Sequence, residues 1–281
     1  MFIEPFSLKE VVQSALKEDL GSGDLTSASI FPSTHLSRAF FLVKKESILC
    51  GLPVVKEIFH QLSPEINFLP QKQDGDRIMP GTVVAEVVGP TYLLLSGERV
   101  ALNFLQRLSG IATLTAKYLA QVEGLDVKIV DTRKTTPGLR VLEKYAVRTG
   151  GGTNHRLGLF DAVMIKDNHI KAAGGIKEAV RLVRQNIPFL TPIEVEAVSV
   201  EDALEALEAG AHVIMLDNMP TDEMARAVQA IGKRAVVEAS GGITLERLRE
   251  VAATRVDVIS AGALTHSAPS IDISMKIQDV L

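Results

Sequence analysis

The 281-residue chain contains a single cysteine, Cys50. One cysteine cannot form an internal disulfide, and it cannot supply a cysteine-based metal cluster. Cys50 stands in the apolar stretch SILCGLPVV, where we expect a packed thiol rather than a nucleophile. Paired histidine spacings such as HxH and HExxH are also lacking. The sequence therefore gives no indication of a tightly held transition metal.

Long hydrophobic runs are absent as well. No apolar stretch reaches the length that is needed to cross a bilayer. Residues 1–21 carry acidic side chains in an amphipathic pattern, which differs from the basic start and apolar centre of a secretory signal. We therefore expect a soluble, cytoplasmic protein without a membrane partner.

An excess of positive charge is lacking too, since 30 Lys and Arg stand against 34 Asp and Glu, with a sequence pI near 5.9. A nucleic-acid binder would spread basic residues over a broad face and tend toward a basic pI. Here the cations concentrate between Asp131 and His169 instead. They are Arg133, Lys134, Arg140, Lys144, Arg148, His155, Arg156 and Lys166. A local cationic cluster in an acidic protein predicts a pocket for a small phosphate or carboxylate compound.

The C-terminal half alternates short apolar runs with amphipathic stretches. The runs cover residues 127–131, 161–166, 193–197, 212–217, 235–240 and 256–260. Apolar strands that alternate with helices predict parallel strands buried on both faces. Each run has a charged or hydroxyl residue at its end or one position before it, as the mouth of a (β/α) barrel requires. A doubly wound open sheet would fit the same alternation. We favour an incomplete barrel, because only six units are present.

The preceding part of the chain has a different pattern. Residues 1–110 predict an α+β domain with antiparallel strands around turns at 74–75, 80–81 and 89–90. A long helical connector then leads to the barrel, which we assign to residues 111–267. The tail, residues 268–281, has strand-like alternation and is expected to return to the first domain.

Three cationic side chains stand at predicted strand ends. Arg133 and Lys134 directly follow Asp131, where they can clamp a carboxylate or phosphate, although a solvated loop is the alternative. Lys166 ends the next strand, and it is either an anion ligand or a Schiff-base amine. Arg99, considered alone, resembles an ordinary surface arginine.

Glycine-rich segments accompany these cations. The glycines at 150–152 precede His155 and Arg156, and they either let backbone N–H groups approach an anion or form a plain turn. Two further loops follow the last two strands, where barrels often hold a phosphate through backbone N–H groups and a helix N-terminus. These loops contain Ser240, Gly241, Gly242, Ala261, Gly262 and Ala263.

Acidic residues also occupy the predicted strands. Glu194 and Glu196 are two positions apart and share one face, which in a barrel is the interior. An unpaired carboxylate there is costly, so both need a cation, a metal or a hydroxylated ligand. We favour a ligand role for Glu196 and Asp217, and pairing with barrel cations for Glu194 and Glu238.

Eight motifs in order resemble the quinolinate phosphoribosyltransferase family. They are EDLGSGDLTS (18–27), ERVALNFLQRLSGIAT (98–113), DTRKTTPGLR (131–140), GGGTNHRLGLFDAVMIKDNH (150–169), IEVE (193–196), LDN (216–218), SGG (240–242) and SAGALTHS (260–267). The resemblance implies an N-terminal open sandwich, an incomplete barrel, and a homodimer or larger assembly, up to a hexamer. It also implies that each site is completed by the neighbouring subunit.

The resemblance further implies roles for individual residues. Thr132, Arg133, Lys134, His155, Arg156 and Lys166 would line the site for quinolinate and pyrophosphate, and Arg99 would reach it from the partner subunit. Glu196 and Asp217 would lie near the ribose and Mg²⁺, and the loops at 240–242 and 261–263 would hold the 5-phosphate. Lys134, Lys166, Glu196 and Asp217 would be the catalytic residues.

The implied reaction transfers phosphoribosyl from phosphoribosyl pyrophosphate to quinolinate, with decarboxylation to nicotinate mononucleotide, in NAD biosynthesis. Three alternatives remain open from the residues. They are a Schiff-base barrel aldolase using Lys166, the molybdenum-operon paralogue of the same fold, and a non-catalytic anion-binding or scaffold protein. The intact motifs KTTPGLR and GGGTNHR favour the biosynthetic enzyme over the paralogue.

Overall fold

The computed structural model describes residues 5–281, so the first four residues of the predicted N-terminal domain lie outside the described residues. Contacts between residues divide the chain into two units. Unit 1 contains Met1–Ala116, Thr136–Gly151 and Ser267–Leu281, and unit 2 contains Lys117–Thr135 and Gly152–His266.

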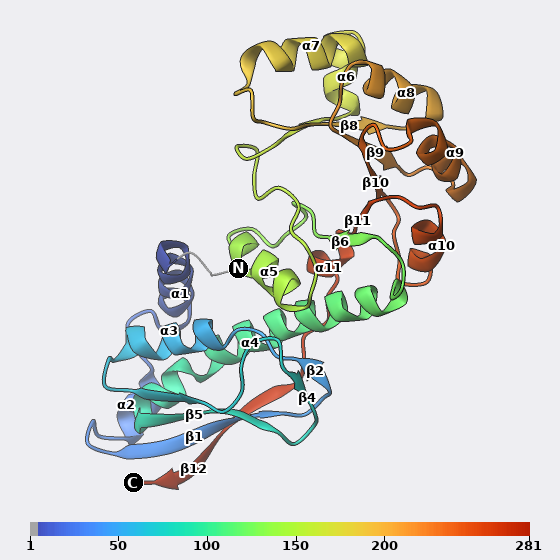
Figure 1. Ribbon diagram of the computed structural model, residues 1–281. Helices are drawn as coiled ribbons and strands as arrows, with labels where there is room; N and C mark the ends of the chain where they lie inside the picture. Colours follow the sequence, from blue (N-terminus) through green and yellow to red (C-terminus); the bar gives the residue numbers. More distant parts are fainter. Residues whose placement is uncertain (1–4) are drawn as a thin grey trace. The chain divides into compact units, whose positions relative to one another are not determined.

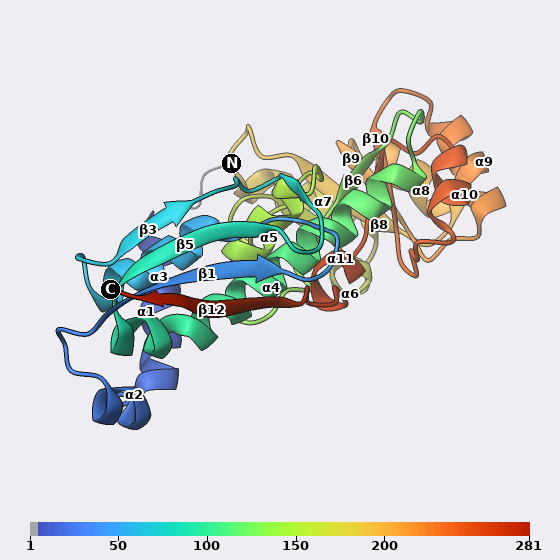
Figure 2. The same cartoon turned by 90° about the horizontal axis from the view of Figure 1, so that it is seen from below.

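Unit 1 is built on an antiparallel sheet with the strand order β12-β1-β5-β3. Its strands are β1 (Leu36–Val43), β3 (Asn67–Pro70), β5 (Val83–Pro90) and β12 (Ile273–Val280), and β2 (Ser47–Ile48) pairs separately with β4 (Arg77–Ile78). Figure 2 shows β12 lying beside β1. Ala39, Phe41 and Val43 are fully buried, while the alternate residues of β1 are partly exposed. This period of two places one face of the strand in the core.

Helices complete unit 1. They are α1 (Pro5–Leu20), α2 (Leu25–Ile30), α3 (Leu52–Leu62), α5 (Arg140–Thr149) and the first part of α4 (Thr91–Gln121). Helix α2 begins where Asp24 accepts hydrogen bonds from the backbone N–H groups of Thr26 and Ser27, both at 3.0 Å. None of the helices in the described part of the chain combines the length and apolar character that would let it cross a membrane.

Unit 2 is built on a parallel sheet with the strand order β6-β11-β10-β9-β8-β7. The strands are β6 (Lys128–Val130), β7 (Val163–Ile165), β8 (Ile193–Ala197), β9 (Val213–Asp217), β10 (Val236–Ser240) and β11 (Val258–Ser260). These are the six strands that the sequence predicts. The pairings described leave the sheet open between its two outer strands, which confirms the incomplete barrel.

Helices alternate with these strands. They are α6 (Asp167–Ala173), α7 (Ile176–Asn186), α8 (Val200–Glu208), α9 (Thr221–Ile231), α10 (Leu248–Ala253) and α11 (Ala263–His266). Figure 1 shows α8, α9 and α10 along the outer side of β8, β9 and β10. Ala203 and Ala206 of α8 are fully buried, and so are Ile214 and Leu216 of β9. The face that includes Ile214 and Leu216 is therefore apolar, whereas the opposite face also carries Glu194, Glu196 and Glu238.

Candidate active site

A hollow of about 500 Å³ lies at the carboxyl ends of the unit 2 strands. Most of the site residues predicted from the sequence line it. They are Thr132, Arg133, Lys134, His155, Arg156, Lys166, Glu196, Asp217, Ser240, Gly241 and Gly242. Asn218, Glu238 and Ser260 also line this hollow, which we call the carboxyl-end hollow. Ala261, Gly262 and Ala263 are not among its lining residues, and Arg99 is exposed on α4 in unit 1.

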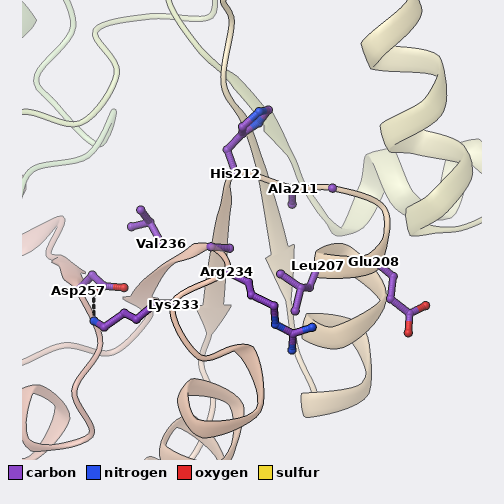
Figure 3. A pocket seen from close by; sticks show the side chains of 10 residues that line it. Leu207, Glu208, Ala211, His212, Lys233, Arg234, Val236 and Asp257 are labelled. Atoms are coloured by element: carbon purple, nitrogen blue, oxygen red, sulfur yellow. Dashed lines mark hydrogen bonds and ion pairs between the residues drawn. The ribbon is translucent and has the colours of Figure 1, made fainter.

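A second hollow, of about 640 Å³, lies where the same strands begin (Figure 3). Its basic side chains are already engaged by the protein. Lys233 pairs with Asp257 at 3.1 Å, and Arg234 donates to the carbonyls of Ala230 and Ile231 in the last turn of α9. Because Lys233 and Arg234 already have protein partners, the carboxyl-end hollow is the stronger candidate for binding an anion.

Local contacts hold the segment that carries Lys134. Its backbone N–H donates to Thr132 Oγ1 at 3.0 Å, and its carbonyl accepts from Thr265 Oγ1 at 2.8 Å. A Cβ at position 262 would lie 2.9 Å from Lys134 Cδ, so Gly262 leaves room for the lysine stem. The loop after β11 therefore supports Lys134, although its residues 261–263 do not themselves line the hollow.

Asp131 anchors a second segment of the site. Its side chain is fully buried at the end of β6, where Oδ1 accepts from the backbone N–H of His155 at 2.9 Å and Oδ2 accepts from Asn154 Nδ2 at 2.5 Å. Thr153 also forms a parallel bridge with Val130 of β6. These bonds fix the backbone from which the side chain of His155 extends. Neither Asp131 nor Asn154 was expected as a site residue, although both stand inside the motifs that were recognised.

The ring of His155 lies between two buried glutamates. Its Nε2 is 3.2 Å from Glu194 Oε2 on β8 and 3.4 Å from Glu238 Oε2 on β10. Its Nδ1 accepts a hydrogen bond from the backbone N–H of Arg156 at 2.7 Å. We call His155, Glu194 and Glu238 the glutamate–histidine cluster. Glu194 and Glu238 pair with a basic side chain, as the sequence favours.

Burial and the contacts among its members shift the pKa values of this cluster. Burial lowers the pKa of His155, but hydrogen bonds with Glu194 and Glu238 outweigh that effect and raise it to about 10. Burial also raises the pKa of Glu194. The His155 Nδ1 accepts the Arg156 N–H, so Nε2 is the ring nitrogen that can donate to the two glutamates. The nearest ligand atoms of the three side chains lie within 4.8 Å of one another.

Arg156 begins a loop that its own contacts hold in place. Its Nη1 donates to the carbonyl of Ala162 at 2.9 Å, while Asp161 accepts from the backbone N–H groups of Leu157 and Gly158. Burial lowers the pKa of Arg156, and the positive charge of Arg133 lowers it further. Two guanidinium groups that repel each other in this way form a good site for an anion.

Lys166 pairs with Glu196 across neighbouring strand ends, with 3.0 Å between Nζ and Oε2. The Glu196 side chain is only 10% exposed, whereas that of Lys166 is 45% exposed. The backbone N–H of Lys166 donates to His169 Nδ1 at 2.9 Å. An ammonium group paired with a carboxylate differs from the desolvated amine that a Schiff-base lysine requires, so the contact weighs against the aldolase alternative.

Asn218 is a site residue that the sequence analysis missed. Its Nδ2 donates to Asp217 Oδ2 at 2.8 Å, and its backbone N–H donates to the carbonyl of Ser240 at 2.9 Å. A side chain on Gly241 would overlap the Asn218 amide. Asn218 thus joins the acid at the end of β9 to the glycine loop after β10. The sequence feature that could have identified Asn218 is its position directly after Asp217 in the motif LDN.

The acids of the hollow suit a hard cation. Glu196 and Asp217 extend from the neighbouring strands β8 and β9 and offer carboxylate oxygens. Mg²⁺ prefers such oxygens and is usually held by one or two carboxylates together with substrate phosphates and water. The residues present therefore fit a magnesium ion.

The fold and this hollow define a class of protein, an incomplete parallel β/α barrel whose mouth gathers cations, acids and a glycine loop. Two family models match the chain. The N-terminal domain of quinolinate phosphoribosyl transferase covers residues 24–109, and the C-terminal domain covers residues 111–276. The chain belongs to the quinolinate phosphoribosyl transferase family.

Individual relatives agree with this assignment. The chain is 49% identical over 270 residues to a probable nicotinate-nucleotide pyrophosphorylase (carboxylating) of Bacillus subtilis, covering 96% of this chain and 93% of that protein. It is 42% identical over 283 residues to the human nicotinate-nucleotide pyrophosphorylase (carboxylating), covering 99% and 94%. The crystal structure of NadC from Streptococcus pyogenes matches with a TM-score of 0.94 at 42% identity, covering 99% of this chain and 100% of that one.

Proposed function

We propose that this chain transfers the phosphoribosyl group of 5-phosphoribosyl 1-pyrophosphate to quinolinate and releases pyrophosphate and CO₂. The product is nicotinate mononucleotide, a precursor of NAD. The observation that carries the proposal is the convergence of cations, acids and a glycine loop in one hollow of a chain that belongs to this family. Both substrates are polyanions, so fixed cations and backbone donors are needed to hold them together.

The cations of the hollow suit the negative groups of the two substrates. Arg133, Lys134 and Arg156 are proposed to hold the two carboxylates of quinolinate, because arginine binds a carboxylate through two parallel hydrogen bonds. Lys134 and Lys166 are proposed to stabilise the departing diphosphate. Thr132 lies beside them and fixes the Lys134 backbone. His155 belongs to the site through its ring contacts with the two glutamates.

The acids suit the ribose. As the pyridine nitrogen attacks the anomeric carbon and the bond to pyrophosphate breaks, positive charge develops on the ribose ring. Glu196 and Asp217 can stabilise that charge, and Asn218 holds Asp217 in place. Mg²⁺ held by Glu196 and Asp217 would offset negative charge on the diphosphate when bound. The loop at 240–242, with the loop at 261–263 behind Lys134, is proposed to receive the 5-phosphate.

Decarboxylation needs no nucleophile from the protein. Once the ring nitrogen is bonded to ribose, it carries a positive charge. The bond between C2 and its carboxylate breaks, the electron pair stays on the ring, and C2 then takes up a proton. The protein's part is to hold the substrate until that step is complete.

The assembly and location belong to the same proposal. We propose a homodimer, or a larger assembly such as a hexamer, in which Arg99 of one subunit reaches the site of its partner. Arg99 is exposed on α4, which is compatible with that role. We also propose that the protein acts in the cytoplasm.

One assay tests the reaction. The purified protein is incubated with quinolinate, phosphoribosyl pyrophosphate and Mg²⁺, and pyrophosphate, CO₂ and nicotinate mononucleotide are measured. We expect all three products in equal amounts and a loss of activity with EDTA that Mg²⁺ reverses. Absence of pyrophosphate release would refute the proposal and favour a binding protein or the paralogue of the same fold.

A further inference from the structure

We propose that His155 is a positioning residue, which holds Glu194 and Glu238 away from the cations that bind the pyridine dicarboxylate and does not itself contact the substrate. The inference rests on the proposed function and assigns a role to the glutamate–histidine cluster within it.

The two glutamates of the cluster are buried. Their side chains are 8% and 3% exposed, and the His155 side chain is 13% exposed. Oε1 of each glutamate is buried and has no hydrogen-bond partner among the residues that the structure describes. Oε2 of each glutamate lies close to His155 Nε2, at 3.2 Å for Glu194 and 3.4 Å for Glu238. Its N–H group is thus the donor that keeps both carboxylates turned into the barrel interior.

Both ring nitrogens of His155 have protein partners. Nε2 faces the two glutamates, and Nδ1 accepts from the backbone N–H of Arg156. A contact with substrate would require His155 to give up one of these bonds. Asp131 also fixes the backbone N–H of His155 at 2.9 Å, so the residue is held at three points.

The two glutamates can compete with the substrate for Arg156. Its charge already interacts with that of Glu194, and Glu238 lines the hollow itself. Without His155, Arg156 is the remaining cation whose charge lowers the pKa of Glu194, so an ionised Glu194 would pair with it. The arginine would then be lost to the substrate, and two negative charges would remain near an incoming dianion.

Substitutions that remove the competing charge test this role. We expect His155→Ala to raise the KM for quinolinate by about 10-fold, with a much smaller change in the KM for phosphoribosyl pyrophosphate. Adding Glu194→Gln and Glu238→Gln to His155→Ala should restore most of the quinolinate KM. The matched control is His155→Ala with Glu178→Gln, because Glu178 is a surface residue on α7 paired with Arg181. That control should restore nothing.

The outcomes separate the two proposals. A wild-type protein without activity refutes the proposed function, and the same variants are then compared by calorimetric titration with quinolinate alone. If the wild type is active and the two glutamine substitutions do not restore the quinolinate KM of His155→Ala, the positioning role is wrong and His155 contacts the substrate directly.

If His155→Ala does not fold, His155→Gln replaces it, since the glutamine amide can donate a hydrogen bond to one glutamate. A quinolinate KM near wild type in that variant supports the proposal, and a defect as large as the one expected for alanine refutes it.

Discussion

The hydroxyl of Tyr145 donates a hydrogen bond to Asp74 Oδ2 at 2.8 Å, joining residues 71 positions apart in unit 1. Asp74 also accepts from the backbone N–H groups of Gly51 and Leu52, where α3 begins. Burial raises the pKa of Asp74 despite these bonds. One carboxylate therefore connects α5 to the start of α3.

Replacing Tyr145 with phenylalanine should reduce the stability of unit 1. The change removes one donor from a mostly buried carboxylate, and we expect a loss of about 1 kcal/mol in the free energy of unfolding. Chemical denaturation of the full chain measures it. Tyr92→Phe on α4 serves as the control and should change stability little. Equal stability of the two variants would show that the Tyr145 hydroxyl contributes nothing.

Removing a cation from the carboxyl-end hollow should reduce turnover. In Lys134→Ala or Arg156→Ala, a substrate anion loses its partner in a partly desolvated site, a cost of about 2 kcal/mol or more. That corresponds to a decrease of about 30-fold in kcat/KM for quinolinate. Arg181→Ala, on the surface of α7, is the control. Kinetics like those of wild type in both hollow variants would refute the assignment of these cations.

Sharing of Arg99 between subunits can be tested by mixing. Arg99→Ala and Lys166→Ala should each be inactive, because each site then lacks one proposed ligand. In hybrid dimers one of the two sites regains both residues, so mixing should restore part of the activity. Subunit exchange is verified with differently tagged chains. No recovery despite exchange would mean that Arg99 acts within its own subunit or not at all.

The cap of helix α2 should respond to pH. Hydrogen bonds from Ser27 lower the pKa of Asp24 below its ordinary value of 3.8. Its stabilising contribution is therefore present above pH 3.8 and is lost as pH falls through the lower folded value. Asp24→Asn keeps the cap without the titration, and Asp24→Ala should cost about 1 kcal/mol at pH 7. Between pH 5 and pH 3, wild type should lose more stability than Asp24→Asn, and parallel curves would contradict this.

Much of the barrel could be predicted from the sequence, because apolar strands with polar ends are a local pattern. Each predicted run contains one strand of the observed sheet, and Asp217 and Ser240 end theirs as expected. The predicted cations at 133, 134, 156 and 166 do meet in one hollow. Parallel strands bring their ends together whatever their separation in the chain, so this convergence followed from the fold class.

The partners of individual side chains could not be predicted in the same way. The spacing of Glu194 and Glu196 shows that they share a face, but not that one meets His155 and the other Lys166. The difference depends on how deep each side chain lies in the barrel. The alternation of residues along a strand does not encode that depth. Asn218 was missed for a related reason, since its role comes from a close approach of the loop after β10.

The crowding between Gly241 and Asn218 limits how this site can vary. The backbone at Gly241 has φ of +87°, and a Cβ there would collide with the Asn218 amide, so two separate penalties exclude any larger residue. A saturation library across 240–242 should therefore return only glycine in the middle. Changes in the shape of this part of the hollow would therefore have to be made at Ser240 or in the segment after β11, while Gly241 and Asn218 are kept as they are.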